Sequence, residues 1–172
     1  MIFVCSLSAV DTTILEKQPS HLISLLDEAS MISTPEAIEA ENHLKLALND
    51  ISAPMTGYET PGQVHVERLV KFIQAWPQTS PLLIHCWAGI SRSTAAAFIT
   101  LCINNPGEDE NNLAQLLRYA SPSATPNKLI VHLADNILGR SGRMVEAIEG
   151  IGRGASAWQG ELFTLPIKTD QA

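Results

Sequence analysis

Cys86 and Arg92 are the two residues of this chain whose types and spacing are best suited to chemistry. They lie in the segment from His85 to Thr94, which reads HCWAGISRST. A thiolate is a strong nucleophile, and the planar guanidinium of an arginine can hold two oxygens of one anion. Six positions separate the two residues, and a loop of that length can curl so that both side chains face its centre. The pattern predicts a loop in which Cys86 attacks an anionic group that Arg92 holds.

The elements that flank this segment would direct it at a single place. Residues 82–84 are wholly apolar, which is typical of a strand buried on both faces, and residues 93–104 contain no proline or glycine and predict a helix. Backbone N–H groups and the positive end of that helix would meet at the turn between them and stabilise the Cys86 thiolate. We therefore expect an anion to be bound by the backbone amides of Trp87, Ala88, Gly89, Ile90, Ser91 and Arg92.

A structural interpretation of the same residues has to be weighed. A lone cysteine is more often a small core residue than a catalytic one, and Arg92 could be an exposed residue at the start of a helix. That interpretation explains each residue separately. It does not explain why a cysteine, a glycine, an arginine and several hydroxyl residues all fall at one strand-to-helix turn, so we favour a catalytic loop.

Residues 85–93 match a known signature throughout, His-Cys-x-x-Gly-x-x-Arg-Ser/Thr. The chain thereby resembles the protein tyrosine phosphatase superfamily, and the sequence Gly-Ile-Ser-Arg-Ser at residues 89–93 is most similar to its small dual-specificity branch. The resemblance implies that Cys86 forms a phosphocysteine intermediate and that Arg92 binds the phosphoryl group. It also implies that Ser93 helps the Cys86 sulfur to depart and that His85 braces the loop from behind. This mechanism requires no cofactor and no metal.

The resemblance also calls for a general acid, which in relatives is an aspartate on a separate loop upstream of the cysteine. Asp50 follows the alternating segment 43–48 and precedes a loop that contains proline and glycine, so it is the expected acid and base. Asn49 and Asp50 could equally be an ordinary turn pair, and Glu59 is the second candidate on the same loop. Asp27 is expected to be a turn residue.

Further residues near the motif carry weaker expectations. Asn127 follows Pro126 and resembles an asparagine that steadies the phosphate loop of dual-specificity relatives, although it could equally be a first-turn helix residue. Trp87 is expected either beneath the loop or at the rim of its pocket. Cys5 and Cys102 are expected in the core, and sequence distance leaves open whether Cys5 reaches Cys86 to protect its thiolate.

Composition limits the class of protein. A chain of 172 residues with 45% hydrophobic residues can form one domain with its own core, and three cysteines do not make a disulfide scaffold. The net charge of −7 argues against nucleic acid and anionic membranes as partners.

The apolar run at residues 1–5 is too short for a signal peptide, so we expect a cytoplasmic protein. The five histidines have no ligand spacing, and no metal is predicted. Arg140, Arg143 and Arg153 could contact an anionic substrate, but we expect them on the solvated surface.

The order of the apolar patterns predicts the fold. We expect strands at residues 2–5, 21–26, 43–48 and 82–84, and helices at 61–76, 93–104, 113–120, 126–137 and 143–151. The Thr34-Pro35-Glu36 sequence predicts another helix start. The fold class is therefore α/β, with a single central, mostly parallel sheet of four to five strands, flanking helices and a helical C-terminal half. We expect the catalytic domain over residues 1–165 and a tail over 166–172.

These observations together predict a protein phosphatase for phosphotyrosine. The 85 residues before Cys86 leave little room for the elements that deepen the pocket of larger tyrosine-specific relatives, so phosphoserine and phosphothreonine also fit. Phosphoinositide phosphatases of the superfamily that the chain resembles often carry lysines in this loop, and none lies between Cys86 and Arg92, so the resemblance ranks phosphoinositide substrates lower. Two rivals remain, a rhodanese-like sulfurtransferase and a phosphate-binding pseudo-phosphatase. The expected partner is a phosphorylated protein or another phosphomonoester, with no nucleic acid or membrane; the oligomeric state is left open.

Overall fold

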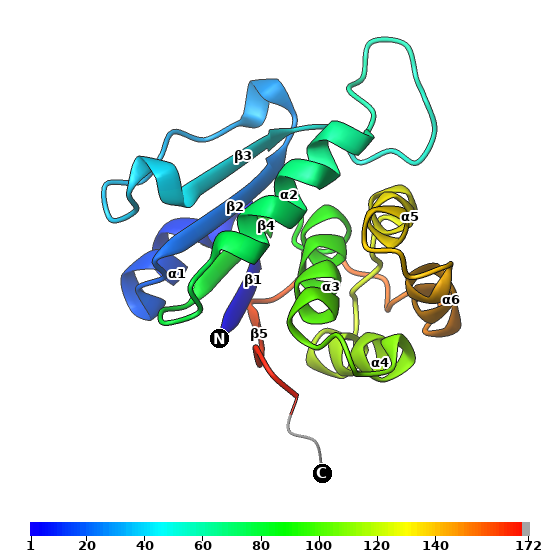
Figure 1. Ribbon diagram of the computed structural model, residues 1–172. Helices are drawn as coiled ribbons and strands as arrows, with labels where there is room; N and C mark the ends of the chain where they lie inside the picture. The colour runs from blue at the N-terminus through cyan, green and yellow to red at the C-terminus, as the bar shows by residue number, and fades with distance from the viewer. Residues whose placement is uncertain (170–172) are drawn as a thin grey trace.

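The computed structural model describes residues 1–169, which fold around a five-stranded sheet (Figure 1). The strand order is β3-β2-β4-β1-β5. The first four strands of the sequence run parallel to their neighbours, and β5 pairs antiparallel with β1. This confirms the predicted α/β fold with a single, mostly parallel sheet. The strands are β1 Ile2–Ser6, β2 His21–Leu26, β3 His43–Ala47, β4 Leu82–Cys86 and β5 Phe163–Leu165.

Helices cover both faces of the sheet, most of them on one side (Figure 1). The large core lies between the sheet and α2 to α6, while a smaller cluster lies under α1 on the opposite face. Helix α3 runs through the large core, and every one of its residues except Ile103 is buried. The helices are α1 Val10–Lys17, α2 Gln63–Ala75, α3 Arg92–Asn104, α4 Glu110–Ala120, α5 Lys128–Ile137 and α6 Arg143–Gly150.

The burial of each strand follows from its place in the sheet. All five residues of β4 and all six of β2 are buried, because helices cover both faces of the central strands. Strand β3 lies at the edge, where Lys45 and Ala47 are partly exposed. The alternating pattern of the sequence had predicted this half-exposed strand.

The prediction of a helix that starts at Thr34-Pro35-Glu36 is wrong. The segment forms a turn followed by a single 3₁₀ turn at Ala40–Asn42. Within residues 34–42 only Ile38 is buried, so this stretch has no apolar face that a helix could pack against the sheet. A capping signal alone did not suffice.

Two elements were not predicted, α1 and β5. Strand β5 has only three residues and follows the glycine-rich stretch after α6, so neither its length nor its surroundings indicated a strand. It adds to the outer edge of β1, with Ile2 opposite Leu165 and Val4 opposite Phe163. Residues 170–172, the end of the expected tail, lie outside the described residues.

The expectation that Arg140 lies on the solvated surface is also wrong. Its side chain is buried and donates to Glu110 Oε1 at 2.8 Å and to the Cys102 carbonyl at 2.8 Å. Glu110 is buried as well and accepts a second bond from the half-exposed Arg143 at 3.1 Å. The counter-charge and the helix-end carbonyl together offset the burial of the guanidinium. Arg153 is exposed.

None of the helices within residues 1–169 is long and apolar enough to span a bilayer.

Candidate active site

The cysteine-containing segment forms a tight loop between the end of β4 and the start of α3. The Cys86 side chain is buried, and its Sγ accepts the N–H of Gly89 at 3.3 Å and lies 3.1 Å from Ser93 Oγ. Gly89 has a φ of +73°, and a β-carbon there would come within 2.8 Å of the Cys5 backbone. The signature glycine is therefore required both for the turn and for the close packing of the loop on β1.

We call this loop, residues 86–92, the phosphate loop. Four of its carbonyl groups accept hydrogen bonds from backbone N–H groups of other segments. In a trans peptide the N–H points away from the C=O, so these contacts turn the amides of residues 88, 89, 91 and 92 toward the centre. Such a ring of amides at a helix N-terminus binds anions. The outer contacts are Leu7 N–H to Trp87 O at 3.1 Å, Gly160 N–H to Ala88 O at 2.8 Å, Thr125 N–H to Ile90 O at 2.9 Å and Asn127 N–H to Ser91 O at 3.3 Å.

Arg92 is the first residue of α3, and its side chain completes the anion-binding site that the loop amides form. Its side chain is buried, and one terminal nitrogen donates to the Leu48 carbonyl at 2.9 Å. Its Nε lies 3.9 Å from Asp50 Oδ2, and no acceptor for this N–H exists within bonding distance in residues 1–169. A buried N–H without an acceptor costs roughly 1 to 3 kcal/mol, and more on a charged group. An anion oxygen in the loop would supply the acceptor.

Asp50 lies directly at the phosphate loop. Its Oδ1 accepts a hydrogen bond from Ser91 Oγ at 2.7 Å and another from Asn127 Nδ2 at 2.9 Å. Its side chain is about one third exposed, so the carboxyl group lies between the loop and solvent. Proton donation to a group held by the loop requires this kind of position.

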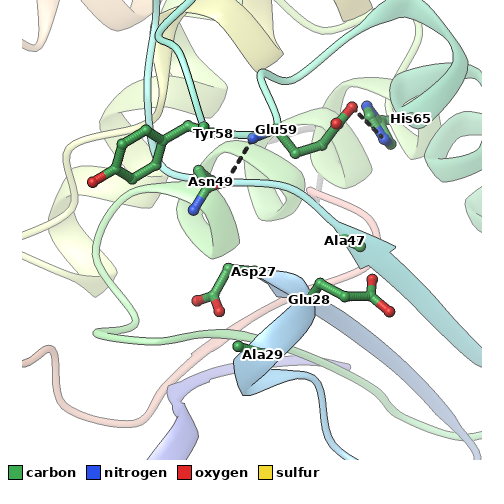
Figure 2. A pocket seen from close by; sticks show the side chains of 9 residues that line it. Asp27, Glu28, Ala29, Ala47, Asn49, Tyr58, Glu59 and His65 are labelled. Atoms are coloured by element: carbon green, nitrogen blue, oxygen red, sulfur yellow. Dashed lines mark hydrogen bonds and ion pairs between the residues drawn. The ribbon is translucent and has the colours of Figure 1, made fainter.

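Glu59, the second candidate acid, lies elsewhere. Its carboxylate is 3.8 Å from His65 Nε2, and its side chain is mostly exposed. Figure 2 shows Glu59 and His65 at a pocket of about 960 Å³ that Asp27 and Glu28 line from the end of β2. Asp50 is not among the residues that line this pocket, but it lines a smaller one of about 500 Å³ together with Ser91 and Asn127. The geometry therefore favours Asp50 over Glu59.

Asp27 begins a 3₁₀ turn after β2, as the sequence predicted for a turn residue. Its carboxylate accepts the N–H of Ser30 at 3.0 Å, and hydrogen bonding to Ser30 holds its pKa below the ordinary value.

Asn127 connects three parts of the site. Its side-chain oxygen accepts the N–H groups of Leu129 and Ile130, both at 3.1 Å, and thereby caps α5. Its side-chain nitrogen donates to Asp50, and its backbone N–H donates to the carbonyl of Ser91. Asn127 therefore caps α5 from the position before it, rather than lying within its first turn, and it also contacts the phosphate loop. The contact with Asp50 was not foreseen.

His85 lies behind the phosphate loop in a buried polar chain. Ser24 Oγ is 2.6 Å from His85 Nε2 and 2.8 Å from His43 Nε2, and His43 Nδ1 is 3.0 Å from Thr34 Oγ1. Burial lowers the pKa of each histidine to about 4, with a further contribution from Lys45 at His43 and from His43 at His85. Both rings are therefore neutral at pH 7. Sequence reasoning missed Ser24 and His43, because only the strand register brings Ser24 opposite His85.

The remaining predicted positions are now located. Trp87 is 56% exposed and lies at the rim rather than beneath the loop. Cys5 and Cys102 are buried, and burial raises the pKa of each thiol to about 12, as expected for core cysteines. Cys5 packs in the small cluster under α1, whereas Cys86 packs in the large core, so their side chains lie on opposite faces of the sheet. This arrangement does not support a protective pairing of the two thiols.

No protein-family model matches the sequence, and no curated protein matches it. Solved structures do match over most of the chain. The crystal structure of DUSP15 has a TM-score of 0.63 at 18% identity, covering 87% of this chain and 90% of that chain. Human DUSP28 has a TM-score of 0.62 at 17% identity, covering 81% and 89%. The phosphatase domain of Yvh1 from Chaetomium thermophilum has a TM-score of 0.58 at 19% identity, covering 83% and 93%.

The protein therefore has the fold of the protein tyrosine phosphatase superfamily. Its structural neighbours include DUSP15, DUSP28 and the Yvh1 phosphatase domain, and it shares the fold of these small phosphatases. The resemblance that the motif at residues 85–93 indicated is thus confirmed at the level of the fold.

Proposed function

We propose that this protein is a cysteine-dependent phosphatase that hydrolyses phosphotyrosine, phosphoserine and phosphothreonine in protein substrates. The observation that carries the proposal is the ring of inward amides around Cys86 Sγ, closed by a buried Arg92 whose Nε has no acceptor in residues 1–169. A phosphoryl group fits this ring in charge and in the number of its oxygens. The dual-specificity fold of the chain supports the same class of reaction.

In the first step the Cys86 thiolate attacks phosphorus. The S–P bond forms while the P–O bond to the substrate breaks, and the electron pair of that bond passes to the leaving oxygen. Asp50, in its acid form, transfers its proton to this oxygen, so that a neutral hydroxyl group departs. The loop amides and Arg92 bind the other three oxygens as negative charge redistributes among them.

In the second step water hydrolyses the phosphocysteine. Asp50, now a carboxylate, accepts a proton from the water as the new P–O bond forms and the S–P bond breaks. The departing sulfur carries negative charge, and Ser93 Oγ, which lies 3.1 Å from it, is positioned to donate a hydrogen bond. Inorganic phosphate then leaves the loop, and Cys86 is again a thiolate.

Substitution of the nucleophile tests this proposal. Cys86→Ser should abolish hydrolysis of p-nitrophenyl phosphate and of phosphopeptides while it retains binding of vanadate or phosphate. Cys102→Ala, a change to a core cysteine on α3, provides the matched control and should retain turnover. Full activity of Cys86→Ser would refute the assignment. Turnover of thiosulfate without phosphatase activity would indicate a sulfurtransferase, and phosphopeptide binding without phosphate release would indicate a binding module.

A further inference from the structure

The chain after α6 returns to the sheet along the phosphate loop. We call residues 152–165 the C-terminal strap, and it runs from the end of α6 to β5 (Figure 1). It is fixed at several points: the N–H of Ala155 donates to the Pro122 carbonyl at 2.9 Å, and Gln159 Nε2 donates to Ser8 Oγ at 3.0 Å. Strand β5 then pairs with β1. The strap is therefore held on both sides of the position where it meets the phosphate loop.

That position is Gly160, which is buried. Its N–H donates to the carbonyl of Ala88 at 2.8 Å. A β-carbon on Gly160 would lie 2.8 Å from the carbonyl oxygen of Gly89, and this neighbour is backbone that cannot rotate away. Two backbones touch here, and only glycine allows the approach.

The group that Gly160 binds belongs to the peptide unit that also contacts the nucleophile. The Ala88 carbonyl and the Gly89 N–H are the two ends of one planar unit. The carbonyl end receives the bond from Gly160, and the N–H end donates to Cys86 Sγ at 3.3 Å. A rotation of this unit would break both contacts at once.

The identity of residue 89 does not by itself fix the orientation of this unit. Gly89 has no side chain and a φ of +73°, and because glycine adopts positive and negative φ about equally readily, its own backbone preference does not select between the two orientations of the unit. Turned over, it would direct the negative end of its dipole at the Cys86 sulfur instead of the N–H. The loop itself therefore needs an external donor to select the productive orientation.

We propose that Gly160 is a positioning residue, whose N–H fixes the Ala88–Gly89 peptide so that its amide stabilises the Cys86 thiolate and receives the phosphoryl group. This inference rests on the proposed function for its consequence in turnover, but its effect on the thiolate can be measured without any substrate. Through Gly160, which lies 74 positions after Cys86 in the sequence, the C-terminal strap becomes part of the active site.

The test compares Gly160→Ala and Gly160→Pro with the wild type, using the pH dependence of Cys86 alkylation by iodoacetamide. Loss of one hydrogen bond to a charged group should slow alkylation at pH 6 by about tenfold or more, and should leave the rate at pH 10 unchanged. The kcat for p-nitrophenyl phosphate should fall by a similar factor. Trp158→Ala, an exposed residue of the same strap, is the matched control and should retain the wild-type profile.

The outcomes are separable. A folded Gly160→Pro protein, which lacks the donating N–H, with the wild-type alkylation profile overturns the inference. If both variants fail to fold by thermal melting, hydrogen exchange of the wild type decides: a protected Gly160 amide supports the inference, and one that exchanges as fast as that of Trp158 overturns it. If the wild type hydrolyses no phosphomonoester while the variants shift the alkylation profile, the proposed function fails and the role of Gly160 stands.

Discussion

The buried chain of His43, Ser24 and His85 predicts a specific loss of stability in acid. The perturbation is a change from pH 7.5 to pH 5.0 in the wild type and in His43→Gln, in which glutamine can still bond to Ser24. In the folded protein the pKa of His43 is about 4, against 6.5 for an ordinary histidine. The unfolded chain therefore binds the extra proton below pH 6.5, and the folded chain binds it only near pH 4.

The magnitude follows from this difference. Stability is fully present above pH 6.5 and is lost as the pH falls toward 4, because the unfolded state takes up protons first. At pH 5.0 the unfolded His43 is charged and the folded one is still neutral. This pH lies about 1.5 units below the ordinary histidine pKa of 6.5, and protonation of the unfolded state alone over that range costs about 2 kcal/mol of unfolding free energy. His43→Gln removes the smaller cause of the lowered pKa of His85, the charge of His43, but the larger cause, burial, acts in both proteins, so most of the contribution of His85 cancels in the comparison.

Urea denaturation at both pH values measures the effect. Between pH 7.5 and pH 5.0 the wild type should lose about 2 kcal/mol more unfolding free energy than His43→Gln does. His132→Gln, on the exposed side of α5, is the control and should lose as much as the wild type. Equal losses in the wild type and in His43→Gln would show that His43 is not kept neutral by its burial, and the reasoning would be refuted.

Four further substitutions test the site. Asp50→Asn should lower kcat for alkyl phosphates by roughly two to four orders of magnitude and less for p-nitrophenyl phosphate, whereas Glu59→Gln should have little effect; the reverse result would transfer the acid role. Arg92→Lys should reduce kcat/KM by roughly 10²-fold or more although charge is retained, because the two-pronged contact is lost; a near-normal value would contradict that geometry. Asn127→Ala should destabilise the protein by about 1 kcal/mol through the lost helix cap, and it should also reduce kcat, since Asp50 loses a donor. Unchanged kcat in that variant would confine Asn127 to capping.

The parts of the molecule that could be predicted from the sequence are those where one short segment contains both the pattern of its secondary structure and the reactive residues. The apolar run of β4, the helix α3 and the glycine between them had to form one turn, and that turn brings Cys86, Ser93 and Arg92 together. Asp50 was predicted as the general acid from the family resemblance and from its position upstream of Cys86 in the sequence. The contacts of Asp50 with Ser91 and Asn127, on two other segments, now give this assignment a geometric basis.

The parts that could not be predicted depend on long-range pairing. Ser24 and His43 join His85 only because three strands lie side by side in one register, and no local pattern records that register. Strand β5 is too short to show an alternation, and Gly160 looks like one more glycine in an irregular stretch. Arg140 was misplaced because the buried Glu110 that neutralises it lies 30 positions earlier in the sequence.

The return of the C-terminal strap to β1 has a consequence for synthesis of the protein. During translation β1 emerges first, and Gly160 and β5 emerge after every helix and the other four strands. Until then the outer edge of β1 is unpaired and the Ala88 carbonyl lacks its donor, although the signature at residues 85–93 is already complete. Contacts of such large sequence separation form late in folding. A growing chain on the ribosome thus contains Cys86 and Arg92 long before the bond from Gly160 and the pairing of β5 with β1 can form.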